Sequence, residues 1–98
     1  MAVDEKTLKA LDLKNLPLPP KPVVEAIEVQ PYVDTTGEES LDVWVVLSDA
    51  TDDDDLTGKN VMQINAAIRE SLLECDIRLF PYVHLIKQSD YRSQMEGE

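Results

Sequence analysis

The stretch from Leu41 to Ser89 constrains the fold most, because it alone contains a strand, a loop, a helix and a second strand in succession. Residues 41–47 alternate apolar side chains on one face and keep apolar residues on the other, which is typical of a buried strand. Apolar side chains then recur at intervals of three and four, which predicts a helix over residues 59–75, with its inner stripe formed by Val61, Ile64, Ile68, Leu72 and Cys75. Residues 77–86 form another apolar strand. This order favours a crossover in which the helix covers one face of the sheet, right-handed if the strands are parallel.

Two further elements precede this stretch. Residues 23–33 alternate imperfectly, and Pro31 removes a backbone donor, so we expect a strand at a sheet edge or one with a bulge. Residues 34–38 read as a turn, which predicts an antiparallel hairpin with the strand beginning near Leu41. At the N-terminus, we expect Asp4 to cap a short helix that carries leucines on one side.

The predicted fold is an α+β two-layer sandwich, with a three-stranded sheet and one main helix in the order α-β-β-α-β. We divide the chain into a short N-terminal helix (1–16), a proline-rich linker (17–22), the α+β domain (23–90) and a flexible tail (91–98). Pro81 suggests that the last strand is also an edge strand or contains a bulge. The main helix has a second apolar shoulder, which we interpret as core on two sides: Met62, Ala66 and Leu73.

The net charge of -11 narrows the classes of partner. Every charged residue between Pro22 and Gly58 is acidic, whereas the flanking segments balance. Nucleic acids and anionic membranes are bound chiefly through Lys and Arg, so we expect neither as a partner. A basic protein partner fits this charge, and the absence of a long apolar run or signal-like start suggests a cytoplasmic location.

The acidic loop, residues 48–58, contains four consecutive aspartates. A solvated loop ahead of a helix explains them, since Asp54, Asp55 and the cap Thr57 suit a helix N-terminus. A divalent cation site and a docking patch for a cationic protein remain as alternatives. The metal candidates are Asp49, Asp52, Asp53, Asp54 and Asp55. The calcium-binding helix-loop-helix pattern fails, because its glycine would fall at Asp54 and its glutamate at Asn60.

The last strand has an unusually apolar second face, which with Trp44 predicts a surface patch on the side of the sheet opposite the helix. We predict that this patch binds a partner through Trp44, Phe80, Tyr82 and Ile86. Either the N-terminal leucine helix or a second copy covers it, and we expect a homodimer or larger complex. His84, the only histidine, reads as a partly buried polar filler, and the lone Cys75 as a small core residue.

Familiar catalytic arrangements such as Ser-His-Asp, CxxC or paired histidines are absent. The element order, with Gly37, Ser40, Asp42 and Asp76, faintly resembles a minimal nucleotidyltransferase-like domain. That resemblance implies paired acids on one strand and a third acid on a later strand: Asp42 matches the second of the pair and Asp76 the third. Leu41 and Ser40 replace the first acid, and the turn lacks the family's glycine-serine pair, which puts activity in doubt.

The sequence therefore predicts a small acidic interaction or regulatory protein without catalytic activity, acting as an oligomer or a subunit of a complex. The alternatives are a degenerate or metal-dependent nucleotidyltransferase-like domain and a protein that binds a divalent cation through its acidic loop. No organic cofactor is expected.

Overall fold

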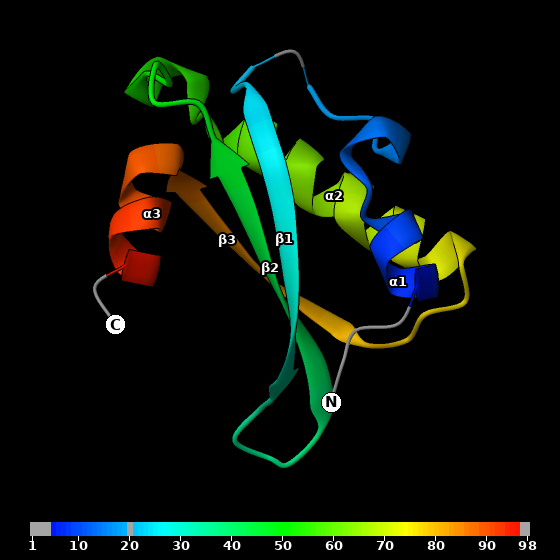
Figure 1. The fold of residues 1–98 in the computed structure, drawn as a ribbon. Coiled ribbons are helices and arrows are strands. Elements are labelled where there is room, and N and C mark those ends of the chain that lie inside the picture. Colours follow the sequence, from blue (N-terminus) through cyan, green and yellow to red (C-terminus); the bar gives the residue numbers. More distant parts are fainter. Residues whose placement is uncertain (1–4, 20, 97–98) are drawn as a thin grey trace.

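A computed structural model describes residues 5–19 and 21–96, apart from the side chain of Met95 (Figure 1). It confirms the predicted α+β class and the order α-β-β-α-β, with one additional helix at the end. The predicted cap Asp4 lies outside the described residues. Within residues 5–19 and 21–96, the search for a helix both long and apolar enough to cross a membrane finds none.

The sheet has three strands in the order β1 (Val24–Val33), β2 (Glu39–Leu47) and β3 (Phe80–Lys87). β1 pairs antiparallel with β2, and β3 pairs parallel with β2. The two strands that contain proline are therefore the two edges, as predicted, and the register of β1 shifts between Val24 and Ala26. The central strand is buried on the side that faces α2, where Val43 and Val45 are both 0% exposed, whereas Asp42 and Trp44 on its other side are partly exposed.

Asp34 organises the hairpin turn between β1 and β2. Its Oδ1 accepts hydrogen bonds from the backbone N–H groups of Thr36 (2.9 Å) and Glu38 (3.1 Å) and from the Thr36 hydroxyl (2.6 Å). Gly37 has φ +85°, a left-handed conformation that glycine adopts without steric cost. The turn thus fixes the direction in which β2 re-enters the sheet.

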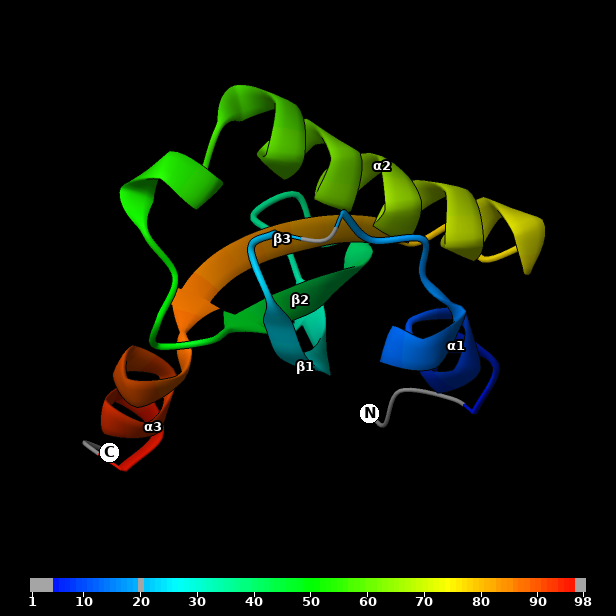
Figure 2. The same ribbon diagram turned by 90° about the horizontal axis from the view of Figure 1, so that it is seen from above.

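The main helix, α2 (Gly58–Glu74), lies against one face of the sheet (Figure 2). The Thr57 hydroxyl accepts a hydrogen bond from the Asn60 N–H at 3.1 Å, which confirms the predicted cap. The helix buries Ile64, Ile68 and Leu72 against the inner side chains of β2. The predicted outer shoulder is not core: Met62 and Leu73 are 73% and 69% exposed, because they point away from the sheet.

The N-terminal elements pack beside α2. They are α1 (Glu5–Ala10) and a short 3-10 turn, η1 (Leu13–Asn15). Ala10 of α1, and Leu11 and Leu16 just after the two elements, are buried in the same core as α2. The Ser71 hydroxyl on α2 donates a hydrogen bond to the Ala10 carbonyl. The N-terminal helix therefore does not cover the opposite face of the sheet, which excludes one of the two covers predicted above.

A third helix, α3 (Gln88–Glu96), follows β3 directly and was not predicted. Residues 91–96 of the segment predicted as a flexible tail (91–98) form the rest of this helix. Figures 1 and 2 show α3 beside the end of β3, away from α1 and α2. Tyr91 anchors it, because its ring centroid lies 6.0 Å from that of Trp44 on β2.

Candidate functional site

The face of the sheet opposite α2 gathers the aromatic side chains. The register pairs Ser40 with Phe80, Asp42 with Tyr82, Trp44 with His84 and Val46 with Ile86. Since paired residues share a face, the structure brings together all the predicted partner-binding residues: Trp44, Phe80, Tyr82 and Ile86. On the other side of β2, Tyr32 pairs with Ser40 and adds a further ring from β1. We call Tyr32, Trp44, Phe80, Tyr82 and His84 the aromatic face.

The rings of the aromatic face are in contact with one another. Tyr82 meets Tyr32 edge to face at a centroid distance of 5.5 Å and Phe80 at 4.8 Å. Trp44 stacks on His84 at 4.3 Å, with the ring planes 23° apart. Phe80 remains 48% exposed and Tyr32 39% exposed. Two half-exposed rings beside stacked neighbours form a preorganised surface, because the rings lose little further rotational freedom on binding.

Asp42 fixes the orientation of His84. The Nε2–H of His84 donates to Asp42 Oδ1 at 3.1 Å, and the side chains are 41% and 24% exposed, respectively. The imidazole is thus held from two sides, by the carboxylate and by the Trp44 ring. His84 is more than a polar filler, since it joins the acidic and the aromatic parts of the face.

Further carboxylates border the aromatic face. The hydroxyl of Tyr82 makes a long hydrogen bond of 3.5 Å to Asp34 Oδ2. Burial, followed by the neighbouring Asp34 carboxylate, raises the pKa of Tyr82. The hydrogen bond from the Thr36 hydroxyl lowers the pKa of Asp34, so Asp34 stays ionised beside the ring. Glu28 faces Trp44 in the register, and together these acids make the border of the face negative.

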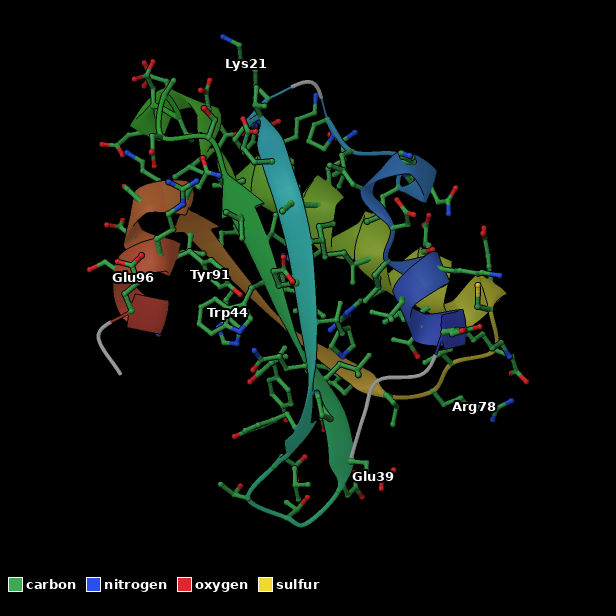
Figure 3. All side chains as sticks on the ribbon, in the orientation of Figure 1. Lys21, Glu39, Trp44, Arg78, Tyr91 and Glu96 are labelled. Atoms are coloured by element: carbon green, nitrogen blue, oxygen red, sulfur yellow. The ribbon has the colours of Figure 1, made fainter. Side chains whose placement is uncertain are left out.

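α3 covers one end of this surface. In Figure 3, Trp44 and Tyr91 lie side by side on the flank of the sheet away from α2. Desolvation, and then the charge of Glu28, raises the pKa of Tyr91. Asp49 Oδ1 accepts the Ser89 N–H at 2.8 Å, which ties the acidic loop to the first turn of α3. Asp49 therefore satisfies a backbone donor at a helix N-terminus.

The acidic loop does not gather its carboxylates around one point. Asp53–Asp55 form a 3-10 turn, η2, in which the Asp52 N–H donates to Asp55 Oδ2 at 3.2 Å. Among the described residues, no group of three or more His, Cys, Asp or Glu side chains is placed to hold a metal ion. The structure thus places the candidate ligands Asp49, Asp52, Asp53, Asp54 and Asp55 in helix-end contacts or in solvent.

The two acids that carry the nucleotidyltransferase-like resemblance occupy different settings. Asp42 lies on the aromatic face and pairs with His84. Asp76 ends α2 with φ +58°, and its carboxylate is 3.6 Å from the Arg78 Nε, with both side chains at least 80% exposed. The described residues do not bring these two acids into a cluster of three ligands. The resemblance stays a hypothesis.

Two contributors to this site, Asp34 and Tyr91, were not predicted from the sequence. Asp34 was read only as part of a turn, although an acid followed by Thr36 and Gly37 is typical of a side chain that caps its own turn. Tyr91 was assigned to the tail, although Ser89 and Asp90 just before it suit a helix N-terminus. No protein-family model, curated protein or solved structure matches the chain.

Proposed function

We propose that the protein is a small acidic interaction module that binds a cationic segment of a partner protein on its aromatic face. The observation that carries this proposal is the stack of Trp44 on His84, held by Asp42 and bordered by Glu28 and Asp34. Aromatic faces attract Lys and Arg cations, and a carboxylate beside the ring adds a hydrogen-bond acceptor. We also propose a cytoplasmic location. Cys75 is the only cysteine and is free, so the chain has no internal disulfide, which fits the reducing cytoplasm.

The aromatic face suits the guanidinium of arginine better than the compact ammonium of lysine. A guanidinium is planar, stacks on aromatic rings and presents several donors to carboxylates. The half-exposed rings of Tyr32 and Phe80 and the partly exposed carboxylate of Asp42 offer both kinds of contact on one face. The net charge of -11 favours encounter with any cationic chain, and the rings supply the short-range part of the binding.

The test uses a blocked tetra-arginine peptide, with Trp44 fluorescence as the reporter because this is the only tryptophan. We expect a saturable change in fluorescence and amide shifts centred on Trp44, Tyr82 and His84. A tetra-glutamate peptide should give neither. Shifts spread evenly over the acidic residues would contradict the proposal.

Two matched variants separate the site from the overall charge. Asp42→Asn and Asp54→Asn each remove one negative charge, but Asp42 lies on the aromatic face and Asp54 is exposed on the acidic loop. We expect Asp42→Asn to weaken binding by about tenfold and Asp54→Asn by less than about twofold. Equal losses of affinity would show that the peptide binds through overall charge alone. A larger loss for Asp54→Asn would show that the peptide binds at the acidic loop.

A further inference from the structure

A groove on the opposite side of Phe80 has a different character. It lies between the end of α2 and the start of β3, encloses about 290 Å³, and is lined by Arg69, Leu72, Leu73, Ile77, Arg78, Leu79, Phe80 and Pro81. We call it the α2–β3 groove. Six of these side chains are apolar and the other two are arginines. Leu73 and Phe80 stand at 69% and 48% exposure, although both are large and apolar. Exposed apolar residues around a hollow are typical of a binding groove.

The charge of the groove is the reverse of that of the chain. The sequence has three arginines, and two of them, Arg69 and Arg78, line this groove on a protein with a net charge of -11. The Arg69 guanidinium carbon sits 5.4 Å from the centroid of the Phe80 ring, which holds it over the groove. Among residues 5–19 and 21–96, Arg78 has one ion-pair contact, to Asp76 at 3.6 Å, with both side chains at least 80% exposed. Such an exposed pair contributes little, so Arg78 is free to exchange partners.

An extended chain has a place to lie beside this groove. β3 is an edge of the sheet, so within the described residues no strand pairs with its outer side. β3 also contains no acidic residue, whereas β1 carries Glu25 and Glu28 and β2 carries Glu39 and Asp42. An unpaired edge next to an apolar pocket is the arrangement used by domains that add a peptide strand, in which backbone bonds give affinity and the pocket gives specificity.

We propose that the α2–β3 groove binds an extended acidic segment of a partner protein, which inserts one apolar side chain beside Leu73 and Phe80 and places carboxylates on Arg69 and Arg78. This site shares only Phe80 with the aromatic face and binds the opposite charge. A second copy of the acidic chain is a poorer occupant, since the like charges of two chains at -11 repel each other.

The probe is a blocked, fluorescently labelled pentapeptide, Glu-Glu-Leu-Glu-Glu, read by anisotropy and by amide shifts. We expect saturable binding with the largest shifts at residues 77–79, which line the groove and do not belong to the aromatic face. The same peptide with Gly in place of Leu should bind at least about tenfold more weakly, and a Lys-Lys-Leu-Lys-Lys peptide should give no shifts at residues 77–79. No saturation at millimolar peptide, or shifts centred on Trp44, would overturn the proposal.

The matched variants are Arg69→Glu and Lys59→Glu. Both reverse one exposed basic side chain on α2, but Lys59 lies at the far end of the helix from the groove. We expect Arg69→Glu to weaken binding by more than about tenfold and Lys59→Glu by less than about threefold. Equal effects would overturn the assignment. So would concentration-dependent shifts at residues 77–79 without peptide, since these would show that a second copy occupies the groove.

Discussion

The end of α2 offers the sharpest test of how the chain places Asp76. The N–H of Asp76 donates to the Leu73 carbonyl at 3.0 Å, and the N–H of Ile77 donates to the Leu72 carbonyl at 2.9 Å. This pattern closes a helix with one residue in the left-handed region, and Asp76 is that residue at φ +58°. Ile77 and Leu72 both belong to the core, as is common at this type of helix end.

Replacing Asp76 with Gly and with Ala measures the backbone directly. The left-handed conformation costs a residue with a Cβ about 1–2 kcal/mol, and the larger freedom of Gly in the unfolded chain returns about 0.4–1 kcal/mol. We therefore expect Asp76→Gly to be more stable than Asp76→Ala by about 1 kcal/mol. With a urea dependence of about 1–2 kcal/mol per molar, the unfolding midpoints should differ by about 0.5–1 M.

Glu70 supplies the control, because it is exposed and lies inside α2. There the order should reverse, with Glu70→Ala more stable than Glu70→Gly by about 1 kcal/mol. Urea unfolding followed by circular dichroism gives all four values. Equal stability of the two variants at position 76, or the helix-interior order there, would refute the assignment of Asp76 to the end of the helix.

Two further predictions address the faces of α2 and the anchoring of α3. Ile68→Ala should lower the free energy of unfolding by about 2–5 kcal/mol, because Ile68 is 0% exposed. Met62→Ala should change it by less than about 0.5 kcal/mol, because Met62 is 73% exposed. Similar losses for the two variants in urea unfolding would contradict the orientation of the helix. The hydrogen bond from the Ser89 N–H lowers the pKa of Asp49. The contribution of this hydrogen bond to the stability of the fold is therefore present above the ordinary aspartate pKa of about 3.9, and it is lost as the pH falls through the lowered pKa. The Ser89 amide shift should therefore titrate below about pH 4, and Asp49→Asn should abolish that titration; an unchanged titration in the variant would show that another group causes it.

The sequence was sufficient for most of the fold because the strongest patterns agree with the packing. The helical spacing of the inner stripe of α2 and the alternation along β2 predicted which side chains face the core, and Ile64 and Val43 are both 0% exposed there. Pro31 and Pro81 correctly identified the edge strands, since a proline has no backbone N–H to donate to a neighbouring strand.

The remaining features depend on contacts between distant residues. The sequence could not show that Tyr91 reaches Trp44, nor that Asp49 bonds to Ser89, because 47 and 40 positions separate these pairs along the chain. Met62 and Leu73 were predicted to be core because apolar side chains on a helix suggest burial, but a three-stranded sheet is too narrow to cover a second side of α2.

Phe80 connects the two proposed binding sites. Its ring meets Tyr82 of the aromatic face at 4.8 Å, while Arg69 of the α2–β3 groove lies over it at 5.4 Å. An occupant of either site would contact this ring, because the ring forms part of both surfaces. Any change that one ligand makes in the affinity of the other must be reciprocal. A cationic segment on the aromatic face and an acidic segment in the α2–β3 groove would therefore be coupled through a single side chain at the edge of the sheet.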